Sequence, residues 1–172
     1  QPLVPGKVGI YACGITAYDL CHIGHARSAI VFDVIVRYMR YRGLNVTFVK
    51  NFTDVDDKIN ATALARQQAG SPGTLEELIR ERTEETIGWY HADMDALGAL
   101  RPTLEPRATE FIGPMITMIE GLIAKGHAYE AEGHVLFSVS SDPDYGKLAR
   151  RDLDEMRAGA RVEVAGEIVG AI

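Results

Sequence analysis

Apolar residues in the first third of the chain form two short runs separated by one longer amphipathic stretch. Residues 8–12 and 46–49 are the short runs, and they have the length and composition of buried strands. Residues 26–42 carry apolar positions at helical spacing, and Gly43 follows them as a left-handed helix stop. Gly14 is expected to open a turn after the first strand. The pattern predicts a β-α-β unit whose two strands are parallel neighbours joined by a right-handed crossover.

Helical patterns dominate the middle of the chain. Residues 54–68 begin with aspartates, as the helix dipole favours, and the glycines and proline of residues 70–73 end this helix with a turn. Thr74 and Glu77 have the spacing of a capping box. A second helix is therefore predicted over residues 75–97.

A further helix is predicted after a loop that two prolines bracket at residues 102–106. Residues 107–125 place their apolar side chains on one side of a helix, and Gly126 closes it. Pro114 falls inside this pattern and is expected to kink the helix.

A hairpin is predicted next. Residues 129–131 and 135–139 are strand-like runs around a Glu-Gly-His turn. Residues 163–172 match no pattern that we can assign.

The composition is globular and narrows the class of protein. Of the 172 residues, 47% are apolar and 24% are charged, which suits one domain or one domain with an insertion. No apolar run is long enough to cross a bilayer, and no signal peptide is recognisable. The net charge of −6 argues against a sequence-independent nucleic-acid binder, although it does not exclude a specific nucleic-acid partner. Four arginines either meet phosphates or are scattered surface residues: Arg150, Arg151, Arg157 and Arg161.

Candidate chemistry gathers between the first strand and the first helix. His22, Gly24 and His25 stand at the mouth of the helix, where helix amides can face an anion. A lone histidine there is usually a satisfied polar residue, but a pair around a glycine, after a strand and a turn, favours a phosphate site. Cys13 by itself would most often be a buried, inert thiol. With Cys21 as the only other cysteine, the chain has no disulfide framework and suits a reducing, cytoplasmic setting.

A longer segment around these residues resembles the signature of one enzyme family. Residues 11–27, YACGITAYDLCHIGHAR, are similar to the signature of cysteinyl-tRNA synthetases. The His-x-Gly-His tetrapeptide alone is shared by all class I synthetases and by related nucleotidyltransferases, whereas Cys13 at its set distance before it points to cysteine. The resemblance continues through residues 51–59, 105–109, 123–129, 144–146 and 159–162.

This resemblance implies an α/β, Rossmann-like fold of the class I synthetase (HUP) type, with a parallel sheet and flanking helices. The chain would contain its first half and the start of an inserted connective hairpin. Residues 1–126 would form the N-terminal half of the catalytic domain, residues 127–162 the start of the insertion, and residues 163–172 an unassigned tail.

The resemblance also implies a reaction. L-cysteine would be activated by ATP, bound with Mg²⁺, to cysteinyl-adenylate and then transferred to tRNA(Cys) by a cytoplasmic, monomeric protein with no membrane contact. Catalysis would consist of positioning and of stabilising charge on the transferring phosphorus. The residues carried over are His22 and His25 as catalytic groups, Thr16, His22, Gly24 and His25 for ATP, Gly14 and Thr53 for cysteine, and Cys13 for Zn²⁺.

The implied zinc ion, one per full-length subunit, would bind the substrate's thiolate. Such a metal prefers sulfur to a hydroxyl and would thereby reject serine. The family's other zinc ligands, a Cys, a His and a Glu farther along the chain, have no counterpart among these residues, and Cys21 is expected to be a packing thiol. The Lys-Met-Ser-Lys-Ser loop that holds ATP phosphates has no counterpart either. We therefore expect an incomplete zinc site, weak or absent metal binding, and no aminoacylation by this chain alone.

Other polar residues have simpler interpretations. Thr53 either lies beside the substrate or caps the next helix. The aspartates 54, 56 and 57 suit an acidic helix start better than a metal cluster. His91 is expected on a helix face, His127 against a helix-terminal carbonyl, and His134 beside the hairpin turn.

Two other functions fit the sequence. One is a cysteine ligase of mycothiol synthesis, which shares the fold and the adenylate. The other is a truncated, non-catalytic module that binds ATP or an adenylate.

Overall fold

The chain divides into two compact parts between Ile112 and Gly113. The computed structural model describes residues 2–150. Several predicted features lie outside the described residues. They are Arg151, Arg157, Arg161, the motif at residues 159–162, the end of the predicted insertion at residues 127–162, and the tail at residues 163–172. The predicted insertion begins at residue 127, which is later in the chain than the division between the two parts. Its assignment stays a prediction.

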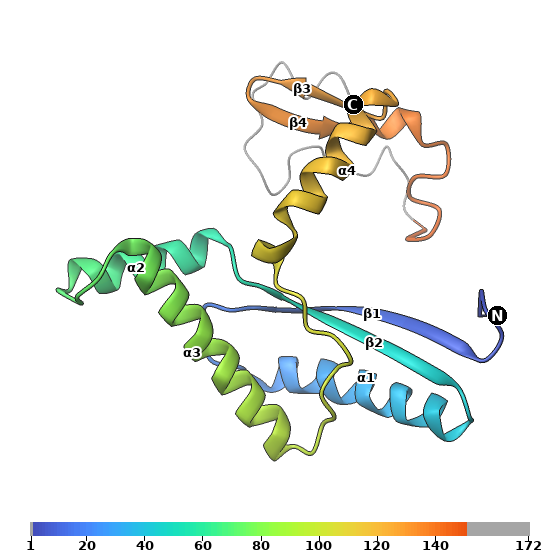
Figure 1. Ribbon diagram of the computed structural model, residues 1–172, viewed down its shortest axis with the longest axis horizontal. Helices are drawn as coiled ribbons and strands as arrows, with labels where there is room; N and C mark the ends of the chain where they lie inside the picture. The colour runs from blue at the N-terminus through green and yellow to red at the C-terminus, as the bar shows by residue number, and fades with distance from the viewer. Residues whose placement is uncertain (1, 151–172) are drawn as a thin grey trace. The chain divides into compact units, whose positions relative to one another are not determined.

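The first part contains a β-α-β unit, as predicted (Figure 1). Strand β1 (Lys7–Thr16) and strand β2 (Asn45–Thr53) pair in parallel, from Lys7 opposite Asn45 to Thr16 opposite Thr53. Helix α1 (Ile23–Tyr41) connects them, and Gly43 follows it with a φ of 82°. Because the strands are parallel, their carboxyl ends lie side by side. The α/β class with a parallel sheet and flanking helices is confirmed.

Strand β1 continues through Gly14, so the predicted turn at this residue is wrong. Ala12 pairs with Lys50 and Ile15 with Phe52, so two β1 residues lie opposite Asn51 alone, which is a β-bulge. A Cβ atom at Gly14 would lie 1.5 Å from the backbone oxygen of Asn51. Gly14 is therefore required by the close approach of β2, and the chain turns only after Thr16.

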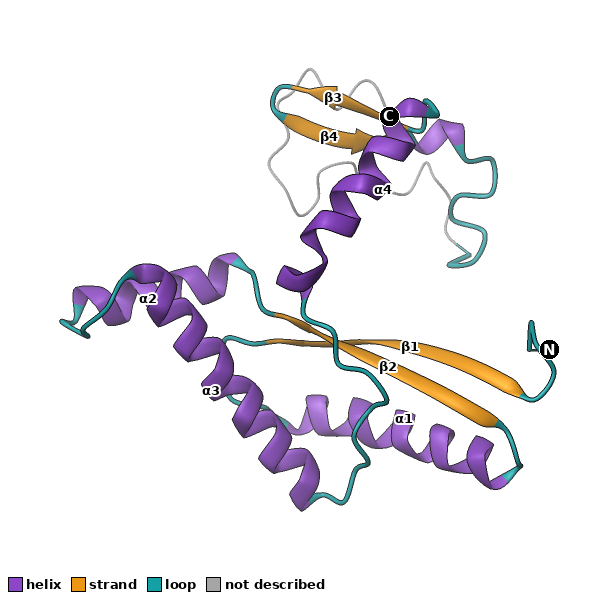
Figure 2. Ribbon diagram, viewed as in Figure 1, coloured by secondary structure: helices purple, strands orange, loops and turns teal. Residues whose placement is uncertain are grey.

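One face of this sheet forms the core. Alternate β2 residues point to this face, and all of them are buried: Val46, Phe48, Lys50 and Phe52. Helix α1 packs on the same face as helix α3 (Leu75–Ala96), which contributes Ile87, Tyr90 and Met94. Both helices therefore cover the same face of the sheet that β1 and β2 form (Figure 2).

The two helices after β2 begin at their capping residues. Asp56 caps helix α2 (Asp57–Gln68), which starts three residues later than predicted. Thr74 and Glu77 form the predicted capping box of α3, and each backbone amide donates to the other side chain.

A segment that runs parallel to β2 includes residues 104–106 of the predicted loop and Arg107, which was predicted to begin a helix. The Lys50 amide donates to the Leu104 carbonyl at 3.1 Å, and the Phe52 amide donates to the Pro106 carbonyl at 2.9 Å. The prolines suggested a loop because they lack an amide proton. At Pro106 the pairing uses only the carbonyl, so proline is tolerated there.

The second part begins with helix α4 (Ile112–Ala124). The continuous helix predicted over residues 107–125 is wrong, because a 3-10 helix, η1 (Ala108–Phe111), precedes α4. Pro114 lies in the first turn of α4, where a missing amide proton costs no helical hydrogen bond, so the predicted kink is also wrong. No residue of α4 is buried.

The predicted hairpin is confirmed. Strands β3 (Ala128–Ala131) and β4 (His134–Phe137) pair antiparallel around a turn in which both Glu132 and Gly133 have positive φ. A short 3-10 helix, η2 (Val139–Ser141), follows. Over residues 2–150 we find no helix that combines the length and the hydropathy of a membrane span.

Candidate functional site

The two histidines cap helix α1 with their own rings. His22 is the N-cap, and its Nδ1 atom accepts a hydrogen bond from the Gly24 amide at 3.1 Å. The His22 amide in turn donates to Nδ1 of His25 at 3.2 Å, and the two ring centroids are 4.0 Å apart. The Gly24 amide, expected to face an anion, is thus occupied by the His22 ring.

This reciprocal cap determines which ring nitrogens remain available. A nitrogen that accepts a hydrogen bond carries no proton, so in the neutral imidazoles the proton is on Nε2. Neither Nε2 atom has a hydrogen-bond partner among the described residues. His22 and His25 therefore present two N–H donors next to the positive end of a helix, an arrangement suited to a phosphate group.

The surroundings keep His25 in the form that this cap requires. Partial burial lowers the pKa of the His25 imidazole, and the charges of His22 and Lys50 lower it further. Protonation of Nδ1 would remove the acceptor that holds the His22 amide. The lowered pKa therefore widens, toward acid, the pH range in which His25 can accept this hydrogen bond.

Gly24 leaves room for the His22 ring. A Cβ atom at Gly24 would lie 2.9 Å from Cε1 of His22 and 3.0 Å from its Nδ1. The glycine was expected to let a nucleotide approach the backbone, and that role stays a prediction.

Two residues predicted to bind substrates lie together at the carboxyl ends of the two strands. Thr16 and Thr53 are register partners at the last pair of the parallel ladder. Thr53 is not the cap of α2, because Asp56 fills that position, so the capping interpretation of Thr53 is wrong. Its backbone oxygen accepts from the Ala17 amide at 3.0 Å.

The three aspartates after β2 have different roles. Asp56 and Asp57 make the expected acidic start of α2. Asp54 does not belong to it, because its buried carboxylate accepts hydrogen bonds from the backbone amide and the hydroxyl of Thr109. Asp54 thus ties the loop after β2 to η1.

The two cysteines differ in exposure. Cys13 is one of the two residues of the β1 bulge and is exposed, so the interpretation as a buried thiol is wrong. Cys21 packs against the core that α1 and α3 share, as expected of a packing thiol. Burial raises the pKa of the Cys21 thiol, and the charge of Asp93 raises it further.

Lys50 of β2 is a buried cation that was not predicted as a site residue. Lys50 faces the core, and its ammonium group donates to the Tyr90 hydroxyl at 2.7 Å. Burial lowers the pKa of Lys50, while the nearby charges of Cys21, Glu105 and Cys13 raise it. The charge of Lys50 also lowers the pKa of His25. The charge of Lys50 therefore acts on both the Cys21 thiol and the His25 imidazole.

The sequence carried a signal for this lysine. Position 50 has the same parity as the apolar residues Val46, Phe48 and Phe52, so its side chain had to point into the core. Its neighbours could not be predicted, because Tyr90 is 40 residues away in the chain.

We expect the Tyr90 phenol to make stability depend on alkaline pH. Burial raises the pKa of Tyr90 to about 12, against 10 for a free tyrosine. Its contribution is complete below pH 10 and is lost as the pH rises toward 12. From pH 9 to 11, the wild-type protein should lose roughly 1 kcal/mol more unfolding free energy than Tyr90→Phe, measured by urea unfolding. The exposed Tyr11→Phe should behave like the wild type, and equal losses for all three proteins would refute the expectation.

The other three histidines lie away from this pair in the chain, and two of them have side-chain partners. His91 on α3 lies 3.1 Å from the Glu105 carboxylate. The backbone amide of His127 donates to the Leu122 carbonyl in the last turn of α4 at 2.9 Å, so the expected contact with a helix-terminal carbonyl is confirmed, and the His127 ring contacts the Ser141 hydroxyl at 2.9 Å. His134 directly follows the hairpin turn, as predicted.

The described residues do not complete a metal site. Within residues 2–150, no group of three His, Cys, Asp or Glu side chains is arranged to hold a metal ion. Cys13 can supply one thiolate ligand, and tight zinc binding requires three or four.

The chain is similar to known proteins over nearly its whole length. Residues 1–168 match the family described as tRNA synthetases class I (C) catalytic domain. A protein of Paracoccus denitrificans named Cysteine--tRNA ligase is 66% identical over 167 residues, which are 96% of this chain and 36% of that protein. The protein of the same name from Yersinia pestis is 54% identical over 166 residues, 96% of this chain and 34% of that protein. The chain thus spans about a third of the length of the curated relatives it matches.

A solved structure supports the fold. A crystal structure assigned as an arginyl-tRNA synthetase from Campylobacter jejuni aligns with a TM-score of 0.59 at 13% identity. The alignment covers 78% of this chain and 39% of that chain.

Proposed function

Because the chain belongs to the family of class I tRNA synthetase catalytic domains of the cysteine type, we propose that it forms part of an enzyme that ligates cysteine to tRNA. In the full-length protein, L-cysteine is activated by ATP to cysteinyl-adenylate and transferred to tRNA(Cys). The relatives' name, Cysteine--tRNA ligase, supports this proposal over a mycothiol ligase or a non-catalytic module.

The observation that carries the proposal is the histidine pair at the start of α1. One loop connects the strand that bears Cys13 to His22 and His25, and both histidines keep an Nε2–H donor with no partner among the described residues. The carboxyl end of that strand adjoins the carboxyl end of β2, where ligands of open parallel sheets bind.

These groups suit adenylate formation. A carboxylate oxygen of cysteine attacks the α-phosphorus of ATP, and the bond from that phosphorus to the pyrophosphate oxygen breaks. Negative charge builds on the phosphate oxygens in the transition state. The two Nε2–H donors of His22 and His25 stabilise it, and their mutual cap holds both rings in place before ATP arrives.

We assign the remaining contacts by position. Thr16 and Gly24 are both assigned to the binding of ATP. Gly14 and Thr53 lie beside cysteine, where the bulge of β1 narrows the space between the strands.

Zinc binding is proposed for the full-length protein only. Cys13 is exposed and can donate a thiolate, but residues 2–150 supply no set of three ligands. When bound, zinc would hold the substrate's sulfur and so favour cysteine over serine.

The test is aminoacylation of a tRNA(Cys) transcript by the full-length protein and by the 172-residue chain. We expect cysteine to be charged by the full-length protein only. Failure of the full-length protein to charge tRNA(Cys), with active synthetase as the positive control, would reject the proposed function.

A further inference from the structure

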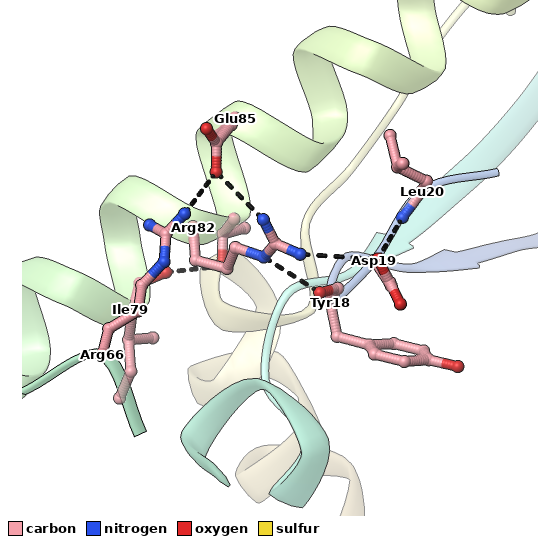
Figure 3. Close-up of polar contacts among 8 residues, drawn as sticks. Tyr18, Asp19, Leu20, Arg66, Ile79, Arg82 and Glu85 are labelled. Atoms are coloured by element: carbon pink, nitrogen blue, oxygen red, sulfur yellow. Dashed lines mark hydrogen bonds and ion pairs between the residues drawn. The ribbon is translucent and has the colours of Figure 1, made fainter. Parts of the chain in front are cut away.

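Arg82 on α3 is directed at the loop that precedes the histidine pair (Figure 3). Its side chain is only 12% exposed. Its Nε atom donates to the backbone oxygen of Tyr18 at 3.0 Å, and a terminal nitrogen lies 3.5 Å from the Asp19 carboxylate. The guanidinium carbon also lies 5.0 Å from the centre of the Trp89 ring. One side chain thus contacts two successive residues of this loop.

Glu85 fixes the orientation of this guanidinium. Its carboxylate accepts from Arg82 at 3.1 Å and from Arg66 of α2 at 2.9 Å (Figure 3). Both arginines donate to the same oxygen, Oε2 of Glu85, whereas only Arg82 also contacts Tyr18 and Asp19. Removing the Arg66 side chain therefore deletes one ion pair of Glu85 and none of the contacts between Arg82 and the loop.

Residues 17–22, the loop between β1 and α1, have few other anchors. Ala17 is fully buried, and its amide donates to the Thr53 oxygen at 3.0 Å. The Lys58 ammonium group lies 5.0 Å from the centre of the Tyr18 ring. Leu20 is exposed, and its amide bonds only to the neighbouring Asp19. Arg82 is therefore the main polar anchor from outside the loop at residues 18 and 19.

We propose that Arg82 is a positioning residue: by holding residues 17–22 against α3, it fixes the point at which His22 begins α1 and so the place of both imidazoles. The inference rests on the proposed function and adds to it a residue outside the family motif. Arg82 reaches no reacting atom in this account. It acts through the Tyr18 backbone and the His22 cap.

An arginine suits this task better than a lysine. The planar guanidinium directs separate N–H groups at Tyr18 and Glu85 while its face lies over Trp89. A lysine ammonium group is a point charge that cannot hold these contacts in a single fixed geometry.

The test compares three variants of the full-length protein in cysteine-dependent ATP–pyrophosphate exchange. Arg82→Ala should lower kcat by about 10- to 100-fold with the KM for cysteine changed less than about 3-fold, because a small displacement of catalytic groups affects the transition state most. Arg82→Lys is the second variant should the alanine form fold poorly, and it should also lower kcat. The matched control, Arg66→Ala, removes the other ion pair of Glu85 and should keep kcat within about 2-fold of the wild type.

Two further readouts distinguish positioning from general stability. Millimolar guanidinium should partly restore the kcat of Arg82→Ala and leave that of Arg66→Ala unchanged. In NMR spectra of ¹⁵N-labelled histidine, the wild type should show unprotonated Nδ1 atoms at His22 and His25, and Arg82→Ala should show mixed tautomers.

Wild-type kcat in Arg82→Ala, or an equal loss of kcat in Arg66→Ala, would overturn the inference. If the wild type itself shows no exchange, the proposed function fails instead. In that case the histidine spectra still decide the role of Arg82, and unchanged spectra in Arg82→Ala would reject it.

Discussion

Replacing Gly14 by alanine is expected to destabilise the protein by about 4 kcal/mol or more. The new Cβ atom would lie 1.5 Å from the Asn51 backbone oxygen, and that oxygen cannot move without separating β1 from β2. The Gly14 amide would also lose its hydrogen bond to the Asn51 side chain at 2.9 Å. Thermal unfolding of the full-length protein measures the loss. Cysteine-dependent exchange should disappear with it, because Cys13 belongs to the same bulge.

Gly9 offers a matched control for this experiment. It lies on the same strand, and a Cβ atom at Gly9 would have no neighbour within 4 Å. Gly9→Ala should therefore change the unfolding free energy by less than about 0.5 kcal/mol. A Gly14→Ala protein as stable as Gly9→Ala would show that β1 and β2 do not approach each other as closely as described.

Replacing His22 by alanine is expected to lower the kcat of exchange by about 10²- to 10³-fold. The substitution removes one Nε2–H donor, and it also removes the cap on the Gly24 amide, which contributes about 1 kcal/mol to stability. The kinetic loss and the stability loss therefore arise from different nitrogens of the same ring.

His22→Asn separates these two contributions. Asparagine is a strong N-cap residue, so this variant should regain the melting temperature of the wild type. It cannot place a donor where Nε2 lies, so its kcat should stay as low as that of His22→Ala. Recovery of kcat together with stability would mean that the histidine serves only as a cap.

The sequence was sufficient for features that depend on neighbouring residues. The stop at Gly43, the capping box of Thr74 and Glu77, and the hairpin were predicted because each depends on residues a few positions apart. The parallel pairing of β1 and β2 was predicted from the general rule for strands that a helix connects. The histidine pair was placed correctly at the helix start because it too depends on residues a few positions apart. That the two rings cap each other requires their side-chain geometry, which the motif alone does not show.

Features set by distant residues were missed. Gly14 appeared to be a turn residue because its true constraint, the Asn51 backbone, lies on another strand. Residues 102–106 were predicted to be a loop, but the carbonyls of Leu104 and Pro106 accept hydrogen bonds from β2. Arg82 belonged to no motif, and its role depends on the Tyr18 carbonyl, 64 positions away in the chain.

The most direct test of the account is cysteine-dependent ATP–pyrophosphate exchange by the full-length protein, with serine as the competing substrate. The account predicts exchange at least about 100-fold faster with cysteine than with serine, and loss of the cysteine-dependent rate in Cys13→Ala. Equal rates with serine, or an undiminished rate in Cys13→Ala, would contradict the claim that this sheet edge is built to activate cysteine.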